Sequence, residues 1–269
     1  IYDCAMSPQE WPSVLQDIAH ASGAFGAMIF DCEWRGATER VALRYCSAVY
    51  DTALVGWYVE THNAPEVCDQ GRFAQLSSLG DEVNLIRCDD LYPSRAELES
   101  KANMQAMMQF GVHYRAGALL SKDSAAMDRF ALQFRKEQGP IAEPARLLAQ
   151  SFLPHVAKAL SIGRAFQENK EQTQALARTL EAVPFGIGVI KAAGDILYAN
   201  AEFRALCDEF RLMRSAKAVL RVETLPLAMQ SLLRSARDHG KFGARPLREA
   251  AFLPGRIEST GLFIEISPI

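Results

Sequence analysis

Aromatic and methionine side chains gather in the first half of the chain, and their types suit small-molecule binding. They are Tyr45, Tyr50, Trp57, Tyr58, Met104, Met107, Met108, Phe110 and Tyr114. Rings with polar tips and flexible thioethers form mostly apolar pockets that carry a few hydrogen-bonding groups. The same side chains would also suit an ordinary core. We predict a small apolar or aromatic effector in a pocket that involves Trp57, Tyr58 and segment 104–114.

Common catalytic signatures are missing from the sequence. It contains no GxSxG nucleophile elbow, phosphate loop, dinucleotide fingerprint or HExxH zinc motif. Asp89 and Asp90 lie in a polar stretch that is typical of a solvated turn rather than of paired acid–base catalysis. The 6 cysteines form no CxxC pair and the 5 histidines are scattered, so no metal site is indicated. We therefore expect a binding module that needs no metal or cofactor, and not an enzyme.

The composition is that of a soluble globular protein. The chain has 269 residues, of which 49% are hydrophobic and 23% charged, and its net charge is -3. This length predicts two domains. The charge is too low for nonspecific attachment to nucleic acid. Because no apolar run approaches the ~20 residues of a membrane span, and because the cysteines lie in short apolar segments that suit reduced thiols, we expect a cytoplasmic protein.

Hydrophobic patterning in residues 1–140 predicts helices on one antiparallel sheet. Ser7 and Pro8 precede an amphipathic helix that Gly23 ends. "AFGAMIF" and "RVALRYCSAVY" predict a hairpin with its connection at 31–38. A helix at 51–62, a long polar stretch, a helix at 95–111 and strands at 112–122 and 127–136 follow. The predicted class is α+β.

Residues 141–183 predict a long helix, because apolar residues recur at helical spacing with little Gly or Pro. Its second half has the spacing of a coiled-coil seam at Ala159, Ile162, Phe166, Asn169, Thr173, Leu176, Leu180 and Val183. Ile162, Phe166, Leu176 and Leu180 are the predicted dimer contacts. A single amphipathic helix packed on its own domain is the alternative, because Asn169 and Thr173 are polar.

Residues 184–269 predict a second small α+β domain. Two strands, at 185–190 and 196–199, are predicted on either side of a turn. Helices are predicted at 201–210 and in "PLAMQSLLRSARDHG". Two further strands are predicted around a Pro254-Gly255 turn. "EAVPFGIGVIKAAGDILYANAEFRALC" resembles the opening of a PAS domain in Pro184, Gly186, Gly194, Asp195, Tyr198 and Asn200. Asn200 is expected to cap the following helix, a role that needs no ligand.

A further resemblance involves the first domain and the long helix. "QEWPSVLQDIAHASGAFGAMIF" and "FRKEQGPIAEPARLLAQSFLPHVAKALSIGRAF" resemble the amino-terminal region of LuxR-type regulators with a GAF/PAS-like sensor, a linking helix, a PAS domain and a carboxy-terminal helix-turn-helix. The resemblance implies two antiparallel-sheet sensor domains joined by a long helix, at 1–140, 141–183 and 184–269.

The resemblance also implies a function. It implies a homodimer that binds a small effector and reaches DNA only through a helix-turn-helix outside this chain, with no membrane partner. Trp57 and Asp69 resemble the pair with which quorum-sensing LuxR proteins hold an acyl-homoserine lactone, although Thr61 stands where those proteins have a Tyr. The sensory half of a histidine kinase or cyclase, or a purely structural dimerisation module, remains an alternative.

Overall fold

The computed structural model describes residues 1–35, 38–77, 83–121, 127–191 and 195–209, with 227, 230–231, 233–234, 249–254 and 261–266. The chain divides into two units, Ile1–Glu168 (unit 1) and Asn169–Ile269 (unit 2). Each unit contains helices and antiparallel strands. This mixture is the α+β class that the sequence predicts.

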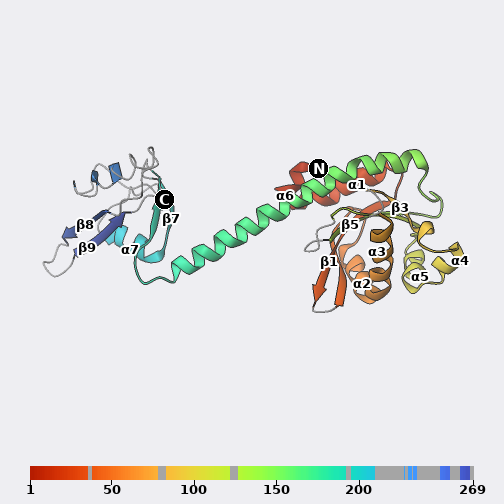
Figure 1. The fold of residues 1–269 in the computed structure, drawn as a ribbon, viewed down its shortest axis with the longest axis horizontal. Coiled ribbons are helices and arrows are strands. Elements are labelled where there is room, and N and C mark those ends of the chain that lie inside the picture. The colour runs from red at the N-terminus through yellow and green to blue at the C-terminus, as the bar shows by residue number, and fades with distance from the viewer. Residues whose placement is uncertain are drawn as a thin grey trace. The chain divides into compact units, whose positions relative to one another are not determined.

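A 5-stranded antiparallel sheet in the order β2-β1-β5-β4-β3 forms the centre of unit 1 (Figure 1). Its strands are β1 (Gly26–Arg35), β2 (Thr38–Cys46), β3 (Ile86–Arg87), β4 (Tyr114–Leu119) and β5 (Met127–Phe134). The hairpin of β1 and β2 is longer than predicted, since strand pairing continues to Arg35 and Thr38. Most of segment 31–38 is therefore strand rather than connection.

Helices α1 (Trp11–Ala21) and α6 (Glu143–Glu181) cover one face of this sheet (Figure 1). Two 3-10 helices, η1 (Tyr2–Ala5) and η2 (Pro8–Glu10), precede α1, and the Ser7 side chain makes no cap hydrogen bond. Gly23, with φ 67°, follows the end of α1 as predicted. The core under the two helices consists mainly of Trp11, Leu15, Ile18, Ile29, Phe130, Leu132, Leu153, Val156 and Leu160.

The opposite face of the sheet carries α2 (Thr52–Thr61), α3 (Asn63–Ser77) and α5 (Ala102–Gln109) (Figure 1). The 3-10 helix η3 (Cys88–Leu91) and α4 (Arg95–Glu99) complete the unit. The single helix predicted at 95–111 is divided, because the backbone of Lys101 is extended and starts a new helix. Helix α3 lies in the long polar stretch, where no helix was predicted.

Strand β5 presents alternate side chains to the two faces. Phe130, Leu132 and Phe134 belong to the core under α1 and α6, whereas Ala131 belongs to the core on the α2 side. Asp128 is buried and accepts hydrogen bonds from Arg44 of β2 at 2.9 Å and from Arg164 of α6 at 2.6 Å. One strand thus supports both α6 and the opposite layer.

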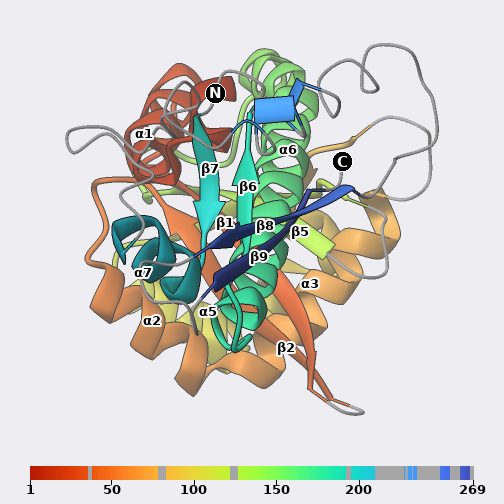
Figure 2. The same cartoon turned by 90° about the vertical axis from the view of Figure 1, so that its left-hand side faces the viewer.

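Unit 2 contains the end of α6, β6 (Gly188–Ile190), β7 (Ile196–Ala199), α7 (Ala201–Glu209), β8 (Glu249–Pro254) and β9 (Gly261–Ile266). Strand β6 pairs with β7 and strand β8 pairs with β9, and in each pair the two strands are antiparallel and run side by side (Figure 2). They match predicted strand pairs. Gly194, most of the predicted helix at 226–240 and the Gly255 turn lie outside the described residues.

Asn200 connects three segments of unit 2. Its Oδ1 accepts from the backbone N–H groups of Phe203 (2.9 Å) and Ile187 (2.8 Å), so it caps α7. Its Nδ2 donates to the carbonyls of Leu180 (3.2 Å) and Phe185 (2.8 Å). A Cβ on Gly186 would lie 2.9 Å from the Phe203 Cα, so only glycine allows this approach.

The predicted helix at 141–183 forms as α6, a single helix of 39 residues. Ala159 is buried in the core of unit 1 and is not part of an exposed seam. Ile162, Phe166 and Leu176 are exposed, and Leu180 is half-buried. Self-association through these side chains stays a prediction.

Candidate ligand-binding site

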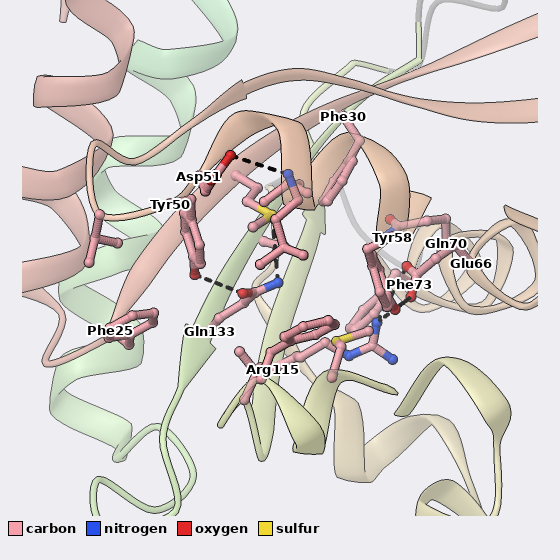
Figure 3. A pocket seen from close by; sticks show the side chains of 18 residues that line it. Phe25, Phe30, Tyr50, Asp51, Tyr58, Glu66, Gln70, Phe73, Arg115 and Gln133 are labelled. Carbon is pink, nitrogen blue, oxygen red and sulfur yellow. Dashed lines mark hydrogen bonds and ion pairs between the residues drawn. The ribbon is translucent and has the colours of Figure 1, made fainter. Parts of the chain in front are cut away.

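A cavity of about 310 Å³ lies between the sheet and helices α2, α3 and α5 of unit 1 (Figure 3). Most of its lining is apolar, and a few polar side chains lie at its two ends. It is lined by Phe25, Met28, Phe30, Val49, Tyr50, Asp51, Leu54, Val55, Tyr58, Glu66, Gln70, Phe73, Met107, Phe110, Val112, Arg115, Ala131 and Gln133. This volume and character are those of small-ligand sites.

One end of the cavity is closed by Tyr50 and Gln133, at the left of Figure 3. The Tyr50 hydroxyl donates to Gln133 Oε1 at 2.7 Å, and Gln133 Nε2 lies 3.6 Å from the Met28 sulfur. Burial raises the pKa of Tyr50 far above its ordinary value, so the phenol stays a neutral donor. A Cβ on Gly26 would lie only 2.5 Å from the Tyr50 ring, which explains the glycine.

The other end of the cavity is a buried ion cluster, at the right of Figure 3. Arg115 of β4 contacts Glu66 at 3.2 Å and pairs with Asp69, both of α3. Tyr58 of α2 donates to Glu66 Oε1 at 2.6 Å. Asn103 of α5 donates to Glu66 at 2.9 Å and to Asp69 at 2.8 Å. Two carboxylates thus face one guanidinium, and three helices are tied to the sheet.

Charge pairing sets the protonation of this cluster. Burial alone would raise the pKa of Asp69, but Arg115 and the hydrogen bonds from Tyr92, Arg115 and Asn103 lower it below the ordinary value. Burial would lower the pKa of Arg115, but Glu66 and Asp69 raise it above the ordinary value. Burial, with the charge of Glu66, raises the pKa of Tyr58. The cluster therefore contains a charged guanidinium, an ionised Asp69 and a neutral phenol.

Several polar groups at this end lack hydrogen-bond partners among the described residues. Gln70 of α3 is 4% exposed, and its carboxamide makes no hydrogen bond within the described part of the chain. The Nε atom of Arg115 and the Oδ1 atom of Asn103 are buried and have no hydrogen-bond partner among the described residues. Figure 3 shows Gln70 beside Tyr58 and Glu66. Because buried polar groups are nearly always hydrogen-bonded, these groups indicate a place for a polar ligand group.

Exposed apolar side chains surround the mouth of the cavity. Val49, Leu54 and Phe110 line the cavity and are also exposed to solvent. Trp57 is 53% exposed and meets Phe110 edge to face, with ring centroids 6.4 Å apart. An apolar ligand would cover part of this surface on entry.

The structure brings only some of the predicted site residues to the cavity. Tyr50, Tyr58, Met107 and Phe110 line it. Trp57 lies outside the lining, next to Phe110 at the mouth. The predicted segment 104–114 therefore contributes only part of the wall.

Other predicted residues lie elsewhere in unit 1. Tyr45 is on the α1 face of the sheet, where it stacks on Trp11 at 5.5 Å. Tyr114 packs on that same core, with the Arg95 guanidinium 4.5 Å from its ring centroid. Their side chains point away from the cavity because they alternate with cavity-side positions on their strands.

Asp69, Met104 and Met108 also do not line the cavity. Asp69 is buried behind the lining and is paired with Arg115. Met104 is completely buried among the residues around Leu98, and Met108 packs against the same cluster. Since Trp57 is exposed and Asp69 is occupied, the structure does not bring together the pair that resembles a lactone site.

The polar cavity residues Glu66, Gln70, Arg115 and Gln133 were not among the predicted site residues. Glu66, Asp69, Gln70 and Phe73 follow the i, i+3, i+4, i+7 spacing of one helix face. That spacing would have predicted α3 if polar residues had been counted as buried.

In the described part of the chain, no group of His, Cys, Asp and Glu side chains is arranged to hold a metal ion. None of the described helices has the length and apolar character needed to cross a bilayer.

No protein-family model matches the chain. No curated protein matches it either. The crystal structure of the VqsR LBD domain from Pseudomonas aeruginosa is similar at 10% identity and a TM-score of 0.46, covering 61% of this chain and 92% of that chain. The E. coli DhaR(N)-DhaL complex is similar at 15% identity and a TM-score of 0.38, covering 81% of this chain and 84% of that chain. Both likenesses are too distant to assign a function.

Proposed function

We propose that unit 1 is a sensor that binds a small, mostly apolar molecule in the cavity between the sheet and α2, α3 and α5. The cavity itself carries this proposal, because about 310 Å³ of mostly apolar space with buried polar groups at its ends suits such a ligand. The exposed apolar mouth at Leu54 and Phe110 gives that ligand an entrance.

A binding role is favoured over catalysis by the lining. The described residues around the cavity include no Ser, Cys, His or Lys. The carboxylate of Glu66 is held by Tyr58, Asn103 and Arg115. Since a general base has to reach the substrate proton and a nucleophile needs an adjacent base, this arrangement supports ligand binding without chemistry.

Strand β5 and helix α6 are the proposed output path. Ala131 and Gln133 line the cavity, whereas Phe130 and Leu132 on the same strand pack under α6. A ligand that shifts β5 would change the packing of α6, provided that it binds the two arrangements with different free energies. Phe166 and Leu176, exposed on α6, are the proposed homodimer contacts.

In its full form, the proposal is the sensory region of a cytoplasmic LuxR-type regulator with a GAF/PAS-like unit 1 and a PAS-like unit 2. DNA would be contacted by a domain other than these two units. The sequence resemblance and the capping role of Asn200 support this version. The sensory half of a histidine kinase or cyclase would use the same cavity and helix.

Binding of N-phenyl-1-naphthylamine, an uncharged apolar dye that fluoresces in apolar surroundings, tests the proposal. We expect the purified chain to bind the dye and Ala131→Phe, which fills the cavity, to weaken binding at least about tenfold. Ala142→Phe, at an exposed position, is the control and should bind as the wild type does. Equal binding by Ala131→Phe would overturn the proposed site.

A further inference from the structure

We propose that the Gln70–Arg115 end of the cavity receives an uncharged head group that both donates and accepts hydrogen bonds, such as a carboxamide. The ligand class is then an apolar chain or ring system that ends in an amide. This inference rests on the proposed function, since it names the chemistry recognised in the same cavity.

Gln70 supplies the first half of the recognition. It lines the cavity and is 4% exposed, and within the described residues its carboxamide has no partner. A buried carboxamide left without partners is unfavourable, so a ligand group that pairs with it is favoured. A primary amide can accept from Gln70 Nε2 and donate to Gln70 Oε1 at the same time, which an ester or a ketone cannot do.

Arg115 and Glu66 supply the second half. Arg115 lines the cavity, and its Nε is a buried donor without a partner in the described part of the chain. Glu66 Oε1 already accepts from Tyr58, Asn103 and Arg115, whereas Oε2 accepts from Arg115 at a longer distance of 3.4 Å. The unpaired donor Arg115 Nε and the weakly paired acceptor Glu66 Oε2 thus lie together, as an amide requires.

The charge of the cluster decides against an anionic head group, and the lack of an acceptor decides against an ammonium. Among the described residues, Arg115 is the cation that pairs with both Glu66 and Asp69. A ligand carboxylate would add another buried negative charge near two carboxylates, which is unfavourable without a further cation. A ligand ammonium would be attracted by the two carboxylates, but it has no acceptor for the donors Gln70 Nε2 and Arg115 Nε.

The rest of the cavity lining suits an apolar tail of the ligand. Beyond Gln70 and Glu66, the lining continues with Phe30, Val55 and Ala131. At the far end, Tyr50 and Gln133 are paired with each other at 2.7 Å. The open hydrogen-bonding capacity therefore lies mainly at the Gln70–Arg115 end.

A matched set of octanamide, octanoate and octylamine tests the inference by displacement of N-phenyl-1-naphthylamine from the wild-type chain. We expect octanamide to compete at least about tenfold better than octanoate and octylamine. Gln70→Leu, which keeps the volume but removes the carboxamide, should reduce the preference for octanamide over octanoate and octylamine about tenfold. Gln105→Leu, at an exposed position of α5, is the matched control and should leave every value unchanged.

The outcomes separate this inference from the proposed function. If the dye does not bind, or binds Ala131→Phe equally, the proposed function fails. If the dye binds the cavity but octanoate or octylamine competes as well as octanamide, only the head-group inference fails. Gln70→Leu that keeps the wild-type preference for octanamide also overturns it. If that variant does not fold, the three wild-type affinities still decide the result.

Discussion

Replacing Arg115 by Met should strongly destabilise unit 1 and reverse the pH dependence that the cluster contributes. Arg115 is buried and is the cation paired with Glu66 and Asp69. Met keeps much of the apolar volume but leaves both carboxylates without a counter-charge. Removing one partner of a buried ion pair costs about 3–5 kcal/mol, so we expect a loss of that size at about pH 7.

In the wild type, Asp69 stabilises the fold in its ionised form. Its pKa in the folded state is lowered below its ordinary value. Its contribution is therefore complete above the unfolded pKa and is lost as the pH falls through the lower, folded pKa. Between about pH 5 and pH 7, this group should add little pH dependence.

In Arg115→Met, burial of Asp69 is no longer opposed by the guanidinium. The pKa of Asp69 should then rise above its ordinary value, because desolvation disfavours the carboxylate. The folded state would bind a proton where the unfolded state does not, so the variant should gain stability as the pH falls from about 7 to about 5. Each unit by which the pKa is raised corresponds to about 1.4 kcal/mol.

Urea unfolding followed by tryptophan fluorescence measures this effect, because Trp11, Trp34 and Trp57 all belong to unit 1. Arg87→Met is the control. Arg87 pairs with Asp90 at 3.3 Å on the surface, so its loss should cost at most about 1 kcal/mol without a reversal. The reasoning is refuted if Arg115→Met loses less than about 1 kcal/mol, or loses the same amount at both pH values.

Three further changes test other parts of the structure. Gly26→Ala should push the Tyr50 ring, 2.5 Å from the added Cβ, away from its partner and cost about 1–3 kcal/mol in urea unfolding; unchanged stability would contradict the packing. Asn200→Ala removes four hydrogen bonds and should cost about 2 kcal/mol of local stability, seen as faster amide exchange in α7, whereas unchanged protection would exclude the capping role. Phe166→Glu combined with Leu176→Glu should give a folded monomer in sedimentation velocity, and a persistent dimer would place the interface elsewhere.

The elements that the sequence predicts well are those with apolar residues at a regular spacing. Helix α1, strand β5 and the long helix α6 each bury an apolar face, so hydrophobic periodicity found them. The division between α4 and α5 was missed. It depends on the extended backbone at Lys101, which no apolar pattern reveals.

Helix α3 was missed for the opposite reason. Its buried face carries Glu66, Asp69 and Gln70, which a hydrophobicity pattern assigns to the surface. They are buried because Arg115, distant in the sequence, meets two of them from β4. A pairing between residues 46 or more positions apart is fixed by the folded sheet and has no local signal.

The cavity was predicted in part. Aromatic and methionine content located unit 1 and found Tyr58, Met107 and Phe110 among the lining. Composition could not assign these residues to one side of the sheet, so Tyr45 and Tyr114 were included although they belong to the opposite core. The side on which a strand residue lies depends on register, which a single residue type does not reveal.

The alternation along β5 has an evolutionary consequence. Ala131 and Gln133 face the cavity, whereas Phe130 and Leu132 support α6. If the cavity binds the proposed ligand, neighbours in the sequence should be under different selection, one set for the ligand and the other for the helix. Among descendants that come to recognise different molecules, positions 131 and 133 should diverge while 130 and 132 persist. The rate of substitution would then alternate from one residue to the next along β5. This alternation would show that one side of the strand determines ligand specificity and the other side supports the helix that responds.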